Sequence, residues 1–202
     1  MDKQQRRDLK KQYKAERQKS DPGYQFISKI NQRIDHADRI KVELFSEWDD
    51  EQVEENIVDY VFNRFKKEGK KPRDMHAAEW ERGILRKLPP GVVAVYATHL
   101  FELCLNVGGG WDFFYQASGA IAMEALDGYK LMNDTKMTSV MEECIGAYLK
   151  LRNSGAVEEA CGEPHQWDFD EQYFIGSNTK TFDQLDKEYR AEGRDFIGKS
   201  FA

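Results

Sequence analysis

The sequence has few of the residues that mark disulfide scaffolds, metal centres or membrane spans. Its three cysteines are odd in number and too far apart for a disulfide framework or a paired metal-ligand motif. No stretch approaches the roughly 18 consecutive apolar residues of a membrane-spanning helix, and the first residues lack the apolar segment of a signal peptide. We therefore expect a soluble, cytoplasmic protein, with reduced thiols at Cys104, Cys144 and Cys161.

Proline is also scarce, with five residues in 202, whereas 33% of the residues are charged. Few prolines and many charges favour helices with charged outer faces over short strands joined by turns. The chain is 40% hydrophobic and 12% aromatic, which is too apolar for a disordered protein. The fold class that we predict is all-α, a single-domain bundle of roughly seven to nine helices.

Charge is divided unequally along the chain. Residues 1–20 carry eight basic and three acidic groups, a local charge of +5, and residues 21–202 therefore carry −11. Only Leu9 and Tyr13 supply apolar area at helical spacing in this first stretch, so we expect a mobile basic helix. The domain division that we predict is a basic arm over residues 1–22 and an acidic helical domain over 23–202. The arm is interpreted as a solvated tail, and contact with nucleic acid or with its own acidic domain is the alternative.

Apolar residues recur at steps of three and four along most of the remaining chain, the period of an amphipathic helix. Ser46 or Asp49 is a candidate N-cap for one helix, and Gly69 is its candidate end. The run over 92–105 favours the central buried helix, although its valines leave a strand as the alternative. The helical segments that we expect cover residues 24–42, 49–67, 74–88, 92–105, 111–129, 134–151, 157–161 and 182–197, with a connection over 162–180.

A first acidic cluster lies in residues 43–59, which contain no lysine or arginine. Carboxylates at steps of four share a helix face and would form a stripe for a basic partner. The alternative is a structural role, because acids in the first turn of a helix and lysines in its last turn stabilise the helix dipole. The partner-binding residues that we predict in this cluster are Glu47, Glu51, Glu54, Glu55 and Asp59.

A second acidic zone follows residue 153, where no lysine or arginine occurs before position 180. Aromatic residues alternate with its acids, a pattern that suits a basic protein surface because charge steers the encounter and rings supply contact area. A solvated loop whose aromatics enter the core is the alternative. The further partner-binding residues that we predict are Glu163, Asp168, Asp170 and Glu171.

Signals for catalysis or cofactors are weak. His165 lies between Glu163 and Asp168, but no second histidine or cysteine follows at ligand spacing. The triplet over 108–110 matches no phosphate-binding motif and favours a tight turn. Ser118, Cys104 and His99 lack the context of a nucleophile elbow. We therefore expect that the protein is not an enzyme and that it binds no metal and no cofactor.

Two segments in the second half carry recognisable motifs. The first contains Leu88-Pro89, Glu102 to Asn106, Gly108-Gly109, Phe113 to Gln116 and Ser118-Gly119, and the second runs from Phe182 to Tyr189 and includes Leu185-Asp186. Together they resemble a bacterial family of small acidic helical proteins typified by a DNA mimic protein, over about residues 88–200. Val107, Gly110 and Gln116 depart from the family pattern. The motif residues are of structural types, so the resemblance supports the fold better than the function.

The resemblance implies a protein that displays carboxylates as DNA displays phosphates and that sequesters a DNA-binding regulator as a homodimer. We therefore expect a basic protein partner, with no nucleic acid bound through the acidic domain and no membrane partner. Carboxylates four residues apart on a helix are separated by about 6 Å, a spacing that makes such imitation feasible. The alternatives are an immunity or antitoxin protein that binds a basic toxin, and a small metal-dependent hydrolase built on His165, Glu163 and Asp168 or on the glycine turn.

Overall fold

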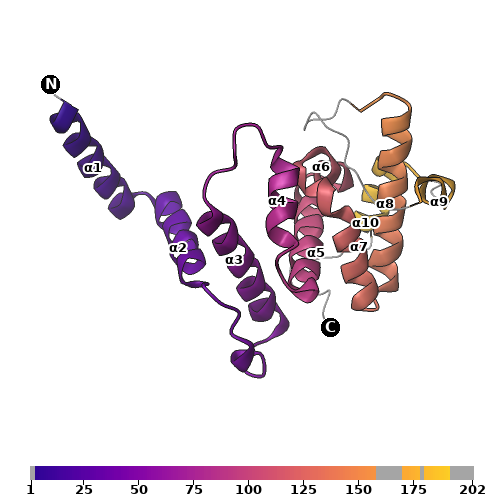
Figure 1. The fold of residues 1–202 in the computed structure, drawn as a ribbon, viewed down its shortest axis with the longest axis horizontal. Helices are drawn as coiled ribbons and strands as arrows, with labels where there is room; N and C mark the ends of the chain where they lie inside the picture. Colours follow the sequence, from indigo (N-terminus) through magenta and orange to yellow (C-terminus); the bar gives the residue numbers. More distant parts are fainter. Residues whose placement is uncertain (1–2, 158–169, 178–179, 192–202) are drawn as a thin grey trace.

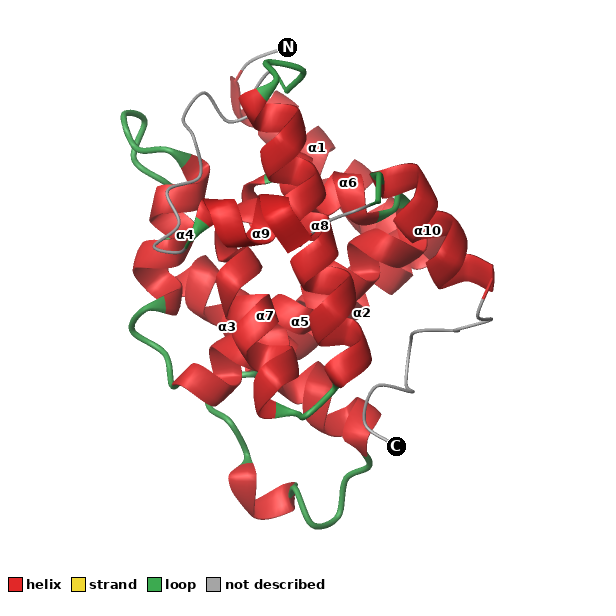
Figure 2. Cartoon of the chain, turned by 90° about the vertical axis from the view of Figure 1, so that its right-hand side faces the viewer, coloured by secondary structure: helices red, strands yellow, loops and turns green. Residues whose placement is uncertain are grey.

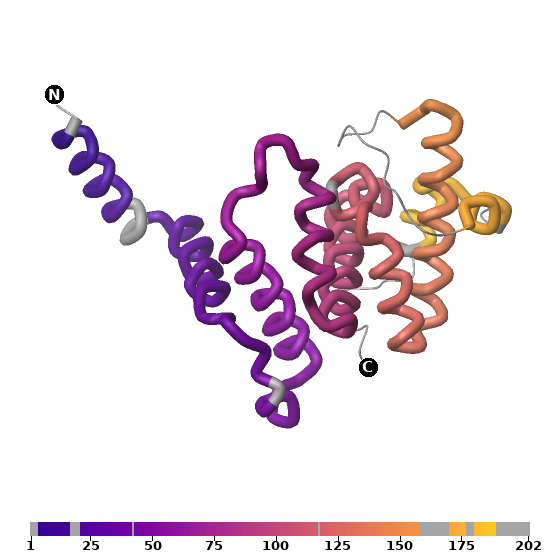
Figure 3. The backbone as a smooth tube through the Cα atoms, viewed as in Figure 1, coloured from indigo at the N-terminus to yellow at the C-terminus, as the bar shows by residue number. Residues whose placement is uncertain are grey.

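The computed structural model describes residues 3–157, 170–177 and 180–191. This part of the chain contains α-helices, two short 3₁₀ helices and no strand (Figure 2). Successive helices lie beside one another, so that the chain advances along the long axis of the molecule (Figure 3). The predicted all-α, single-domain bundle is confirmed.

The structure has more and shorter helices than the sequence pattern indicated. The predicted segment 111–129 is divided, because Gln116 is extended (φ −94°, ψ 172°) and interrupts the helical hydrogen bonding. Residues 171–177 were expected to be a connection and form a helix, while the short helix expected at 157–161 lies almost wholly outside the described residues. The described helices are α1 (Lys3–Ser20), α2 (Pro22–His36), η1 (Val42–Leu44), α3 (Asp50–Glu68), α4 (Ala77–Leu85), α5 (Pro90–Val107), α6 (Gly110–Tyr115), η2 (Ala117–Ile121), α7 (Ala122–Leu131), α8 (Thr135–Asn153), α9 (Glu171–Ser177) and α10 (Phe182–Ala191).

Local signals account for where several helices begin. The Asp21 carboxylate accepts hydrogen bonds from the backbone N–H groups of Gly23 (2.9 Å) and Tyr24 (3.2 Å), and a proline occupies the first position of α2. Asp134 caps α8 in the same way, with the N–H of Met137 as donor at 2.9 Å. Such caps satisfy backbone donors that have no partner inside the helix.

The core is centred on α5, which packs against α3 on one side and α7 on the other. Val93, Ala97 and Phe101 are among its buried residues, which confirms a helix rather than a strand in this run. At Gly128 of α7 an added Cβ would lie 3.1 Å from the carbonyl oxygen of Ala94, so glycine permits the close approach of α5 and α7. Among the described helices α5 is also the one that is long and apolar enough to cross a membrane. Its packing on both sides is that of a core helix.

The first two helices lie at one end of the bundle (Figure 1). All described side chains of α1 are exposed, and α1 points away from the body with α2 as its packing neighbour. No residue of α2 is fully buried, and Phe26 and Ile27 are 64% and 58% exposed. The bundle therefore consists of a tightly packed body from α3 onward and a loosely attached helical arm.

Candidate binding surface

Four exposed acidic residues surround the start of α3, namely Glu47, Asp49, Asp50 and Glu51. We call them the carboxylate turn. Within the described residues, no ion pair neutralises Glu47, Asp50 or Glu51. Unpaired carboxylates in water present a negative potential to any approaching cationic surface. The carboxylate turn is therefore the part of the first acidic cluster that remains open to a partner.

The carboxylate turn is held by a capping box. The Asp49 side chain accepts a hydrogen bond from the N–H of Gln52 (2.9 Å), and the Gln52 side-chain oxygen accepts one from the N–H of Asp49 (3.2 Å). The predicted N-cap is thus confirmed at Asp49. Ile57 and Val61, about two and three turns after Asp49, are buried and anchor the helix in the core. The capping box and these buried residues therefore hold the backbone from Asp49 onward.

The predicted stripe is not continuous along one helix face. Glu47 precedes α3 and lies in a turn, where its N–H bonds to the carbonyl oxygen of Leu44 at 2.9 Å. Residues 47 and 51 therefore do not have the helical relationship that a spacing of four implies. This part of the prediction is wrong because the capping box at Asp49 begins the helix later than the acidic pattern suggests.

Three residues predicted to bind a partner already have partners in the chain. Glu54 pairs with Nδ1 of His99 on α5, and its side chain is only 19% exposed. Glu55 forms an ion pair of 2.8 Å with Arg33 on α2, and Asp59 pairs with the same guanidinium. Asp59 is also buried, with 4% of the residue exposed. Glu54 and Asp59 are thus corrected from surface contacts to internal ones, and Glu55 is exposed but neutralised.

The positive charge of Arg33 stabilises the carboxylates of Glu55 and Asp59. Burial raises the pKa of the Asp59 carboxyl above its ordinary value, and the positive charge of Arg33 opposes this effect only in part. Asn63, one turn beyond Asp59, is buried and donates to the carbonyl oxygen of Ile34 at 2.7 Å. A second ion pair joins Asp35 to Lys66. Polar contacts therefore hold α2 against α3, where few apolar side chains are buried.

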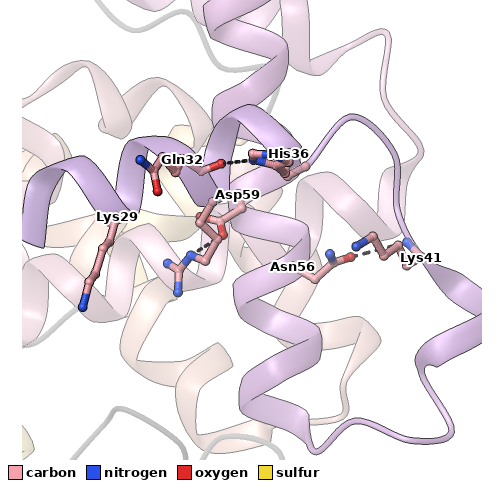
Figure 4. A pocket seen from close by; sticks show the side chains of 8 residues that line it. Lys29, Gln32, His36, Lys41, Asn56 and Asp59 are labelled. Carbon is pink, nitrogen blue, oxygen red and sulfur yellow. Dashed lines mark hydrogen bonds and ion pairs between the residues drawn. The ribbon is translucent and has the colours of Figure 1, made fainter.

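An open polar cleft of about 520 Å³ lies between α2 and α3 (Figure 4). Its charged walls mix cations with Asp59, and Arg33 is already paired. Nδ1 of His36 lies 2.6 Å from the carbonyl oxygen of Gln32, and the N–H of Lys41 lies 3.5 Å from Oδ1 of Asn56. These contacts are made within and between the segments that line the cleft. The cleft is lined by Lys29, Gln32, Arg33, His36, Ala37, Lys41, Asn56 and Asp59.

Two of the four partner-binding residues predicted in the second acidic zone lie within the described residues. Asp170 is exposed, and its carboxylate accepts from the N–H groups of Gln172 (3.0 Å) and Tyr173 (3.2 Å) at the start of α9. Glu171 forms an ion pair of 2.7 Å with Arg152 on α8 and is thus neutralised. Glu163 and Asp168 lie outside the described residues, together with His165, so the metal reading has no structural test.

The candidate nucleophiles have structural partners or buried positions. Burial raises the pKa of the Cys104 and Cys144 thiols, which disfavours the reactive thiolate. The hydroxyl of Ser118 donates to the carbonyl oxygen of Phe113 at 3.0 Å, while His99 faces Glu54. Among the described residues no group of three metal-ligating side chains occurs.

The glycine triplet forms a tight joint between helices. Gly109 has a φ of +91°, and the N–H of Gly110 donates to the Asp186 carboxylate of α10 at 2.8 Å. An added Cβ at Gly109 would lie 2.1 Å from that carboxylate, and one at Gly108 would lie 1.6 Å from Asp112. The tight-turn interpretation is confirmed. The two motif segments of the second half thus meet in one place.

The described part of the chain is an all-helical domain that exposes a few carboxylates without an ion pair at the start of α3. The profile of the DMP19-like protein family, where DMP19 denotes DNA mimic protein 19, matches residues 86–200. This match covers more than half of the sequence, and the chain belongs to the DMP19-like family. No curated protein and no solved structure matches the chain.

Proposed function

We propose that this chain is a non-enzymatic binding protein that engages a positively charged protein by presenting carboxylates where DNA presents phosphates. The observation that carries the proposal is the carboxylate turn, whose acids are exposed and have no neutralising partner among the described residues. Membership of the DMP19-like family supports the same class of activity. The carboxylate turn precedes the matched residues 86–200, so the family match does not cover it.

The physical basis is electrostatic steering onto a rigid surface. The net charge of −11 over residues 21–202 attracts a cationic partner from a distance, and the carboxylate turn provides a fixed contact. The capping box keeps the Asp49 backbone in place before binding, which reduces the entropy lost on association. The partner class that fits is a DNA-binding protein with a basic surface, and a regulator of transcription in the cytoplasm is the specific form that we propose.

The binding surface is smaller than the sequence indicated. It retains Glu47 and Glu51 and adds Asp50, whereas Asp170 is a separate exposed acid, because α9 packs on α8 across the bundle from α3 (Figure 1). Glu163 and Asp168 lie outside the described residues and stay as predictions. Glu54, Glu55, Asp59 and Glu171 are assigned to internal ion pairs.

The proposal is tested by capture of the partner and by competition with DNA. Immobilised full-length chain is exposed to lysate of its native host at low salt, and bound proteins are identified by mass spectrometry. We expect a basic DNA-binding protein that duplex DNA displaces from the bait. The proposal is contradicted if the captured protein stays bound in excess DNA.

Matched variants assign the contact to the carboxylate turn. Glu47→Gln/Asp50→Asn/Glu51→Gln removes three negative charges and leaves the Asp49 cap intact. Asp74→Asn/Asp127→Asn/Asp183→Asn removes three exposed charges that are scattered over the body. The amount of captured partner should fall with the first variant and persist with the second. Equal loss of captured partner in the two variants would show that binding depends on net charge and not on the carboxylate turn.

A further inference from the structure

The N-terminal helix α1 has one strongly basic face that the acidic domain does not cover. Successive residues of an α-helix are rotated by about 100°, so five described cations fall within an arc of about 140°. All five are exposed, and within the described residues no acidic side chain pairs with any of them. The basic face consists of Arg6, Arg7, Lys10, Lys11 and Lys14.

The acidic residues of α1 lie away from this face. By helical rotation, Asp8 and Glu16 fall outside the arc of the five cations. Asp8 accepts a hydrogen bond from the Gln4 side chain at 3.2 Å. The basic face therefore presents about 12 Å of uninterrupted positive charge along the helix axis.

We propose that the basic face of α1 binds the phosphate backbone of duplex DNA without reading its sequence. Charge selects a polyanion, and the helix diameter of about 10–12 Å matches the roughly 12 Å width of the B-DNA major groove. The deep, narrow major groove of duplex RNA does not admit a helix in this way. On α1 the described aromatic residues are limited to Tyr13, which is too few for the stacking platform of a single-strand binder.

The geometry of the arm keeps the contact away from the acidic body. Helix α1 is about 27 Å long and points away from α3 to α10 (Figure 1). Charges in 0.1 M salt are screened over about 10 Å, so the first turns of α1 lie beyond the reach of most body carboxylates. A chain with a net charge of −6 can thus hold DNA through this arm.

Other polyanionic surfaces fit less well. An anionic membrane would need an apolar face to insert beside the cations, and the described large apolar side chains of α1 are Leu9 and Tyr13. A second copy of the chain offers the carboxylate turn, whose four acids are spread over a turn and the first residues of α3. DNA presents one charge per about 1.7 Å of duplex and releases condensed counterions on binding. Five adjacent cations therefore bind DNA more favourably than they bind the carboxylate turn of a second copy.

The test measures fluorescence anisotropy of two unrelated duplexes of about 20 bp with the full-length chain over a range of salt. We expect dissociation constants that are equal for both sequences and a slope of log K against log salt of about −4 to −5. Arg6→Gln/Lys10→Gln/Lys14→Gln should make this slope shallower by about 3, because each lost phosphate contact lowers it by about 1.

A matched control separates the basic face from net charge. Lys67→Gln/Lys70→Gln/Arg73→Gln removes three exposed cations from the end of α3 and the loop that follows. This control variant should show the same slope of log K against log salt as the unsubstituted protein. Equal losses in the two variants, tenfold discrimination between the duplexes, or no DNA binding at low salt would each overturn the proposal.

Two further measurements test whether the basic face binds something other than DNA. Sedimentation at low salt without DNA reports self-association, and flotation with anionic phosphatidylserine vesicles reports membrane binding. If either interaction depends on the basic face while DNA binding does not, the proposal is overturned. Because the variants leave the carboxylate turn intact, loss of DNA binding and loss of the protein partner are separate results.

Discussion

The Asp186 carboxylate accepts a hydrogen bond of 2.8 Å from the N–H of Gly110, across 76 residues of sequence. This contact joins α10 to the first residue of α6. Gly109 lies beside this contact with a φ of +91°, a backbone conformation that residues other than glycine rarely adopt. The two segments that resemble the DNA-mimic family are therefore two halves of one structural joint.

Replacement of Asp186 by alanine should destabilise the protein by about 1–3 kcal/mol, because the N–H of Gly110 loses its acceptor in a part-buried position. Urea unfolding followed by circular dichroism measures the change. Asp183→Ala is the control, since Asp183 is exposed on the same helix. Equal destabilisation by the two changes would show that the contact to Gly110 contributes nothing.

Replacement of Gly109 by alanine should be more costly than the same change at Gly155. Both glycines have positive φ values, 91° and 73°, so both alanines incur backbone strain of about 1–3 kcal/mol. A Cβ at Gly109 also meets Asp186 at 2.1 Å, while one at Gly155 meets nothing within 4 Å. Thermal unfolding of the two variants compares them. Similar melting temperatures would mean that the joint relaxes around the added methyl group.

Arg33→Ala should destabilise the protein more than Asp59→Asn. Loss of Arg33 leaves the buried Asp59 carboxylate without its cation, at a cost of about 1–3 kcal/mol, whereas asparagine removes the charge itself. Chemical unfolding at neutral pH measures both variants. The opposite ranking would show that Asp59 is not the group that Arg33 stabilises.

The effect of Arg33→Ala should also depend on pH. Burial raises the pKa of Asp59, so the folded protein binds a proton there more readily than the unfolded chain does. Stability from this group is present at low pH and is lost as the pH rises through the raised pKa. The deficit of Arg33→Ala should therefore be largest at neutral pH and narrow on acidification. Asp59→Asn/Arg33→Ala should lack this pH-dependent part.

The sequence predicted the fold well where periodicity and caps agree. The Asp49 cap and the end of α3 at Gly69 are both found. Periodicity was less informative for α2, where Phe26 and Ile27 are exposed although they follow helical spacing. An apolar pattern shows that a helix has a face to cover, but not whether another helix covers it.

The candidate site was only partly predictable, because its neutralising charges come from distant parts of the chain. Arg33 is 22 residues from Glu55, and His99 is 45 residues from Glu54. A stretch without nearby lysine or arginine therefore does not imply free carboxylates. The signal that was available is the spacing of four between Glu55 and Asp59, which suits a single arginine from a neighbouring helix.

Asp49→Ala should lower stability by about 1 kcal/mol through loss of the cap on α3. Asp49→Asn keeps an acceptor for the N–H of Gln52 and should retain most of that stability. Urea unfolding of both variants separates the cap from the charge. If the two variants are equally destabilised, the charge of Asp49 contributes more than its hydrogen bond.

Exposed acids at the start of α3 should steer a basic protein into contact. Surface plasmon resonance gives the association rate constant of the captured partner at about 0.05 M and 0.2 M salt. For the original chain this rate should fall steeply with salt, and Glu47→Gln/Asp50→Asn/Glu51→Gln should reduce both the rate at low salt and its salt dependence. An association rate constant that is the same for both proteins at both salt concentrations would show that these acids do not steer the partner.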